Sequence, residues 1–111
     1  LGLITYSNES KNKLLGIPME TIKRHGAVSR QVASLMAKNV RILGNASYGI
    51  GITGIAGPRG ATNKKPVGLV YIAFSSKNKV ICREFHFLGT RNLIKYKSTQ
   101  AALNTIRKET T

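Results

Sequence analysis

The first half of the chain has the hydrophobic pattern of one strand followed by three helices. Leu1–Tyr6 is a short, apolar and β-rich run, which predicts a strand. Further along, between Ser29 and Gly44, apolar residues three and four positions apart predict a helix with a continuous buried face. A polar cap or a proline precedes each helix and a glycine follows it. The predicted helices are Glu9–Leu15, ended by Gly16; Pro18 to about His25, followed by Gly26; and a third helix that Ser29 caps and Gly44 ends.

The second half has the pattern of three strands and a closing helix. The last two strands are expected to form a hairpin that turns at Lys77–Asn78, and the order of elements predicts an α/β domain with a mixed sheet and helices on its faces. We assign residues 1–111 to one such domain. The predicted elements are strands at Tyr48–Thr53, Pro66–Ser75 and Val80–Leu88 and a helix at Arg91–Lys108.

Five of the eleven glycines lie within residues 49–60, in a strand and the loop that follows it. Gly49, Gly51 and Gly54 match the spacing of a dinucleotide-binding fingerprint, but that fingerprint has its glycines in the turn between a strand and a helix. Here the first two glycines lie within the predicted strand, and no helical pattern follows. The segment Gly54–Gly60 is therefore either a nest of backbone amides that holds an anion or an ordinary tight connection.

The formal net charge is +14, from 18 Lys and Arg against four glutamates and no aspartate. The scattered glutamates argue against a pair of catalytic carboxylates. Isolated histidines argue against a metal centre, and a single cysteine excludes an intramolecular disulfide framework. Any chemistry must then rest on hydroxyls, amines and backbone amides. The basic residues occur in every segment and form no stripe, which favours a generally basic surface over the alternative of nucleic-acid binding.

Lys11 lies where the first strand leads into the first helix. A lysine that is desolvated at such a junction loses its proton and serves as a base toward a hydroxyl. A solvated lysine on a capped helix is the simpler interpretation, and the residues alone favour it.

The longest apolar run, Val67–Phe74, is too short to span a bilayer, and no secretory leader is visible. We therefore expect a cytoplasmic protein without a membrane partner.

Five motifs, in their order and spacing, resemble the CinA C-terminal domain family of competence/damage-inducible proteins, whose domain also occurs alone as a bacterial nicotinamide-nucleotide amidase. The resemblance covers nearly the whole chain. It implies a three-layer α/β/α sandwich that hydrolyses nicotinamide mononucleotide to nicotinic acid mononucleotide and ammonia, without a metal or organic cofactor. The motifs are Tyr6-Ser7-Asn8-Glu9-Ser10-Lys11, Gly26-Ala27-Val28-Ser29, Ile52-Thr53-Gly54-Ile55-Ala56-Gly57-Pro58, Pro66-Val67-Gly68 and Gln100-Ala101-Ala102-Leu103.

The resemblance also implies roles for individual residues. Lys11 would be the base that activates a hydroxyl nucleophile, while Tyr6 and Thr53 would orient the substrate amide or share the proton relay. The remaining residues would line the pocket, stabilise an oxyanion or hold the substrate phosphate. The expected substrate-binding residues are Asn8, Gly54, Ala56, Gly57 and Arg91.

The chain departs from the family pattern at its beginning. The family domain begins upstream of Leu1 with a strand and a helix opened by a Glu-Ser-Cys-Thr-Gly-Gly motif, whose serine is the expected nucleophile. We therefore expect this chain to lack that strand and helix and to be active only when such a segment is supplied. The expected partners are a pyridine mononucleotide, that segment and further copies of the chain. The alternative is an inactive CinA-like fragment that serves as a basic nucleic-acid-binding module.

Overall fold

A computed structural model describes the backbone of residues 8–111 and the side chains from Lys11 onward, apart from that of residue 13. The predicted strand Leu1–Tyr6 lies outside the described residues. The elements that follow agree with the sequence pattern to within a few residues at each end. They are the helices α1 (Asn8–Leu15), α2 (Met19–His25), α3 (Arg30–Leu43) and α4 (Arg91–Glu109), and the strands β1 (Tyr48–Gly54), β2 (Leu69–Ser76) and β3 (Val80–His86).

The caps explain where the two long helices begin. The Ser29 hydroxyl accepts a hydrogen bond of 3.2 Å from the amide of Val32 and fixes the start of α3. The Thr90 hydroxyl accepts one of 3.3 Å from the amide of Leu93 and does the same for α4. Each bond satisfies one of the amides that a first helical turn leaves without a partner.

The three strands form one sheet in the order β1-β2-β3, and both pairings are antiparallel. The sequence predicted a mixed sheet that includes a strand at Leu1–Tyr6, which lies outside the described residues; the three described strands pair only antiparallel. Consecutive strands are joined here by a hairpin and by the loop of residues 55–68, and neither is a helical crossover of the kind that parallel neighbours require. The sheet is therefore a meander in the part of the chain that the structure describes.

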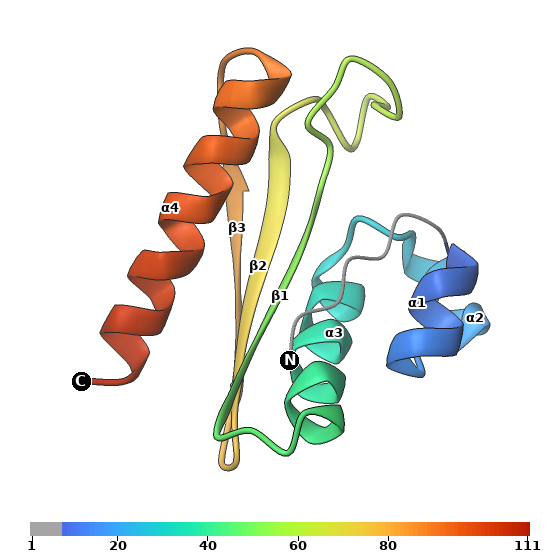
Figure 1. Cartoon of the computed structure of the whole chain (residues 1–111). Coiled ribbons are helices and arrows are strands. Elements are labelled where there is room, and N and C mark those ends of the chain that lie inside the picture. Colours follow the sequence, from blue (N-terminus) through green and yellow to red (C-terminus); the bar gives the residue numbers. More distant parts are fainter. Residues whose placement is uncertain (1–7) are drawn as a thin grey trace.

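Helices cover both faces of the sheet (Figure 1). On one face, Ala33 and Ala37 of α3 pack against Ala73 of β2. On the other face, Ile94 of α4 forms a core cluster with Val70 of β2. The short helices α1 and α2 lie beyond α3, on its outer side, where they share a separate apolar cluster with it (Figure 1). The described layers thus run from α1 and α2 through α3 and the sheet to α4.

The glycines of β1 let α3 lie directly on the strand backbone. A Cβ atom at Gly49 would collide with the carbonyl oxygen of Ala37, and one at Gly51 would collide with that of Ala33. Both glycines are buried within the strand. The first two glycines of the fingerprint-like spacing therefore reflect close packing of a helix on a strand, as expected when glycine replaces a side chain at a contact.

Candidate functional site

Lys11 is buried in α1, with only 6% of its surface exposed. Burial lowers the pKa of its amine from the ordinary lysine value, because desolvation disfavours the charged form. The Asn12 side-chain amide donates to the carbonyl of Ile17 at 2.8 Å, and the Asn39 side-chain amide of α3 donates to that of Leu15 at 2.5 Å. These bonds fix the end of α1 against α3 and so position Lys11. Tyr6 and the side chain of Asn8, also predicted site residues, lie outside the described part.

Thr53 lies near the end of β1 and is buried, with 7% exposure. It alternates with Gly49 and Gly51, so its side chain points to the face of the sheet that α3 covers. Its hydroxyl donates a hydrogen bond of 2.8 Å to the carbonyl oxygen of Ala27, just before α3 begins. The oxygen of this hydroxyl keeps its capacity to accept a hydrogen bond.

Thr53 opens a row of polar residues that crosses the sheet on the α3 face. In the strand register, Thr53 lies opposite Tyr71, and Tyr71 lies opposite Glu84. Arg30 of α3 lies over the Tyr71 ring, 5.6 Å from its centroid, and its guanidinium is 3.8 Å from the Glu84 carboxylate. The Nε2 atom of His86 is 2.8 Å from Glu84.

These contacts shift two pKa values in the row. Hydrogen bonding to His86, and then to Tyr71, lowers the pKa of Glu84. Burial and then hydrogen bonding to Glu84 raise the pKa of Tyr71, so this tyrosine keeps its proton at neutral pH. This row cannot be seen in the sequence, because it becomes visible only when the register of three strands is known.

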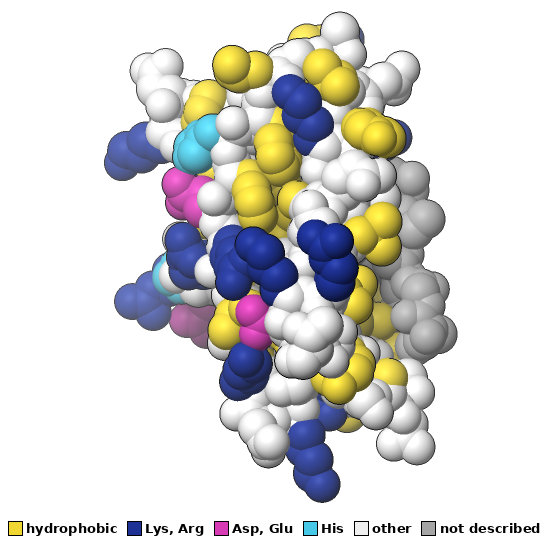
Figure 2. Space-filling model, turned by 90° about the vertical axis from the view of Figure 1, so that its left-hand side faces the viewer, with side chains coloured by type: hydrophobic (Ala, Val, Ile, Leu, Met, Phe, Trp, Pro, Cys, Tyr) yellow, Lys and Arg dark blue, Asp and Glu magenta, His cyan; other side chains and the backbone are white. Residues whose placement is uncertain are grey.

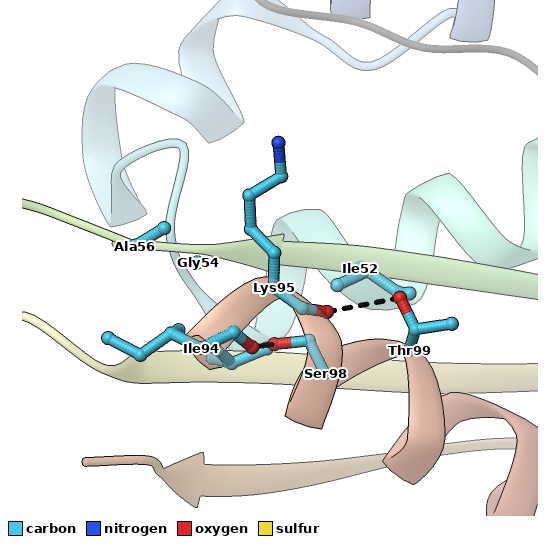
Figure 3. A pocket seen from close by; sticks show the side chains of 8 residues that line it. Ile52, Gly54, Ala56, Ile94, Lys95, Ser98 and Thr99 are labelled. Atoms are coloured by element: carbon cyan, nitrogen blue, oxygen red, sulfur yellow. Dashed lines mark hydrogen bonds between the residues drawn. The ribbon is translucent and has the colours of Figure 1, made fainter. Parts of the chain in front are cut away.

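On the opposite face, a hollow of about 230 Å³ lies between β1, β2 and α4, and we call it the α4 hollow (Figure 3). Its wall is mostly apolar. The hydroxyls of Ser98 and Thr99 donate to carbonyls of their own helix, at 2.7 Å to Ile94 and 3.0 Å to Lys95. In Figure 3 the amine of Lys95 points away from the other labelled side chains. The lining residues are Ile52, Gly54, Ala56, Val70, Ile94, Lys95, Ser98 and Thr99.

Two predicted residues, Gly54 and Ala56, therefore line the α4 hollow, whereas Thr53 faces α3 on the other side of the sheet. Lys95 and Ser98 also line this hollow, and neither was a predicted site residue. Their spacing of three positions was the available signal, since such residues are neighbours on a helix.

The glycine-rich loop between β1 and β2 is held at both ends. Near its start, the Arg91 guanidinium of α4 donates to the carbonyl oxygen of Gly57 at 3.0 Å. Near its end, the Lys65 amine donates to the carbonyl oxygen of His25, the last residue of α2, at 2.6 Å. Arg91 and Gly57, both predicted to bind substrate, are thus in direct contact.

The backbone amides of this loop are not equally available to a ligand. The amide of Ile55 donates to the carbonyl of Leu69 at 2.9 Å. The amides of Ala56 and Gly57 have no hydrogen-bond acceptor among the described residues. These two amides therefore keep their capacity to donate, and the guanidinium of Arg91 is hydrogen-bonded to Gly57 beside them.

Other classes of site are not seen in residues 8–111. No three His, Cys, Asp or Glu side chains described by the structure lie together as a metal site would require. None of the described helices combines the length and the apolar character needed to cross a membrane. The thiol of Cys82 has its pKa raised by burial, which disfavours the reactive thiolate.

Comparison with known proteins places these features in a family. The model of the CinA C-terminal domain matches residues 1–110. A putative competence-damage inducible protein of Caldicellulosiruptor saccharolyticus is 52% identical over 107 residues, which are 96% of this chain and 26% of that protein. One of Thermoanaerobacter pseudethanolicus is 44% identical over 108 residues, 97% of this chain and 26% of that protein. The chain therefore spans about a quarter of the length of these curated relatives.

Solved structures agree with this result. The competence/damage inducible protein CihA from Agrobacterium tumefaciens superposes with a TM-score of 0.93 at 36% identity, over 96% of this chain and 66% of that one. A competence or damage-inducible protein from Enterobacter asburiae gives a TM-score of 0.93 at 30% identity, over 99% of this chain and 69% of that one. The chain belongs to the CinA C-terminal domain family.

Proposed function

We propose that this chain provides part of an active site that hydrolyses the carboxamide of nicotinamide mononucleotide, giving nicotinic acid mononucleotide and ammonia. The observation that carries the proposal is the burial of Lys11, which lowers the pKa of its amine. A lysine that is neutral for part of the time can accept a proton from a hydroxyl. Membership of the CinA C-terminal domain family supports the proposal, because the resemblance implies this activity.

In the proposed reaction, Lys11 takes the proton of a serine hydroxyl as the serine oxygen attacks the carboxamide carbon. The serine belongs to the segment that the resemblance places upstream of Leu1, so the proposal concerns this chain together with such a segment. The Lys11 ammonium then gives its proton to the nitrogen of the tetrahedral intermediate, whose C–N bond breaks to release ammonia and leave an ester. Water hydrolyses the resulting ester by the reverse use of the same groups.

The hydrogen bond of Thr53 supports one of the two parts proposed for it. Because its proton is donated to Ala27, the Thr53 oxygen is an acceptor, and we assign it to an N–H of the substrate carboxamide. The amides of Ala56 and Gly57 and the guanidinium of Arg91 would hold the phosphate of the nucleotide. The Arg91 guanidinium has five N–H donors, so it can bind Gly57 and a phosphate together.

The test is ammonia release from nicotinamide mononucleotide by the chain preceded by a serine-containing segment. We expect Lys11→Met to lower turnover by about a hundredfold or more, as loss of a general base does. Lys23→Met, at an exposed position of α2, removes a lysine elsewhere and is the matched control. Equal turnover in the Lys11→Met and unsubstituted proteins would exclude the assigned base.

A second candidate function is suggested by a separate observation. The fold gathers basic side chains at the end of the sheet farthest from this site, and these support the alternative of nucleic-acid binding.

A further inference from the structure

We propose that the end of the sheet at the β2–β3 hairpin binds single-stranded nucleic acid, at a place separate from the amidase site proposed above. A hollow of about 290 Å³ lies between α3 and this hairpin, and we call it the hairpin hollow. Four basic side chains line it and no acidic one does: Lys38, Arg41, Lys77 and Lys79. In sequence these residues are spread over two segments, so only the fold brings them together.

Most of this charge is not neutralised. Glu109, at the end of α4, pairs with Lys79 at 2.7 Å and with Arg83 at 3.4 Å. Within the part of the chain that the structure describes, Lys38, Arg41 and Lys77 have no ion pair. Arg41 is instead held by a hydrogen bond of 3.2 Å from its Nε atom to the buried Ser75 hydroxyl. Such uncompensated cations around one hollow attract a polyanion.

The positive charge extends beyond the hollow. The face that α4 covers carries many Lys and Arg side chains and few acidic ones (Figure 2). Lys108 precedes Glu109 at the end of the same helix. The part of a bound polyanion that extends out of the hairpin hollow would therefore lie near further basic side chains.

An exposed aromatic ring beside this charge favours a single strand. A second hollow of about 650 Å³ adjoins the first, shares Arg41 and Lys77 with it and includes Tyr48. Tyr48 is 49% exposed, and its ring lies 5.5 Å from that of the buried Phe74. One side of the Tyr48 ring thus packs against Phe74, while part of the ring remains exposed. Cations beside an accessible aromatic ring are the usual means of binding unpaired bases and their phosphates.

The hairpin hollow and the proposed amidase site lie at opposite ends of the strands. Tyr48 begins β1, and Thr53 and Gly54 end it. A strand of this length extends about 20 Å. Nucleic-acid binding at the hairpin hollow can therefore be measured in variants that leave the proposed amidase site unchanged.

The experiment measures fluorescence anisotropy of a fluorescein-labelled oligothymidylate of about 20 nucleotides, a length that exceeds a typical single-strand site. The 111-residue chain is titrated at several salt concentrations between about 50 and about 200 mM. We compare Lys38→Gln/Lys77→Gln with Lys23→Gln/Lys64→Gln, which removes the same charge from exposed positions outside both hollows.

We expect the first double variant to bind about tenfold more weakly and to lower the salt slope by about 1.4, since each phosphate contact on a single strand contributes about 0.7. The control should change affinity by less than about twofold, because its lysines contact no phosphate. Equal losses in both double variants, or no salt-dependent binding by the unsubstituted chain, would overturn the proposal.

Two further variants test the single-strand part. Tyr48→Leu should weaken binding by about fivefold or more, whereas Tyr96→Leu, an exposed tyrosine on α4, should not. Glu109→Gln should tighten binding, because it frees Lys79 and Arg83. Unchanged affinity in both Tyr48→Leu and Glu109→Gln, or preferred binding of a duplex, would contradict the assignment.

Discussion

The hydroxyl of Thr53 donates its proton to the carbonyl oxygen of Ala27 across the interface between β1 and the start of α3. The bond is 2.8 Å long, and Thr53 is buried. It links the end of a strand to the segment that leads into a helix of another layer. A residue that the resemblance marks as catalytic therefore also has a structural role, and the two roles can be separated by substitution.

Thr53→Val should destabilise the fold, whereas Thr53→Ser should retain most of the stability. Valine has nearly the shape of threonine but leaves the Ala27 carbonyl without its donor, at a cost of about 1–3 kcal/mol. Serine keeps the donor. The measurement is the free energy of unfolding in urea for the three proteins. A Thr53→Val protein as stable as the unsubstituted one would show that the bond contributes little.

Gly51→Ala should be more destabilising than Gly60→Ala. At Gly51 an added methyl group collides with the backbone of α3, and overpacking of this kind costs about 1–3 kcal/mol or more. At Gly60 a Cβ atom meets nothing within 4 Å, although the φ angle of +90° is unfavourable for alanine. Thermal unfolding of both variants provides the comparison. The reverse order would mean that α3 moves away from β1 at little cost.

The buried amine of Lys11 should make stability depend on pH in a defined direction. Its pKa is lowered in the folded protein, and in the unfolded chain it returns toward 10.5. Between these two values the unfolded chain binds more protons, so the folded state gains stability as the pH rises. This contribution is complete above the unfolded pKa and is lost as the pH falls through the folded one.

The check is urea unfolding of the unsubstituted and Lys11→Met proteins from neutral pH to above 10.5, the ordinary lysine value. The stability of the unsubstituted protein relative to Lys11→Met should increase over this interval. Lys23→Met reports the effect of removing a lysine from an exposed position. A stability difference that stays constant with pH would show that the Lys11 amine is not desolvated.

Arg91→Gln should loosen the glycine-rich loop without unfolding the protein. The substitution removes the donor to the Gly57 carbonyl, at an exposed position where large losses of stability are not expected. Hydrogen exchange of the amides of Ile55 and Gly68, which are hydrogen-bonded at the two ends of the loop, should become faster. Arg107→Gln, at an exposed position near the other end of α4, is the control and should leave this exchange unchanged. Equal exchange in both variants would mean that Arg91 does not hold the loop.

Local sequence signals were sufficient to predict most element boundaries. The cap at Ser29 and the glycines at positions 16, 26 and 44 act within one turn of a helix, so neighbouring residues decide them. The start of β2 was predicted at Pro66 but lies at Leu69. The amide of Leu69 donates to the carbonyl of Pro66, and Gly68 has a φ of +95°, so this stretch turns before the strand begins.

The candidate site was less predictable, because it depends on faces and register. Thr53 and Gly54 are adjacent in sequence and point to opposite sides of the sheet. Tyr71 and Glu84 are far apart in sequence and lie opposite one another. The alternation of faces follows from strand geometry. Which helix covers each face, and which residues of β1 and β2 lie opposite one another, do not follow from local pattern, since the long loop between these strands leaves their pairing register open. The basic residues of the hairpin hollow also come from separate elements, so the sequence alone does not show that they lie together.

The loop of residues 55–68 has one anchor in each outer layer, through Arg91 on α4 and Lys65 on the last carbonyl of α2. These two helices have no other direct tie in the described structure. A ligand that orders the loop would therefore depend on the positions of both helices. A distortion of either helix would change the loop to which the ligand binds. Affinity at this end of the sheet should accordingly be linked to the stability of α2, an element that contributes no residue to the proposed chemistry.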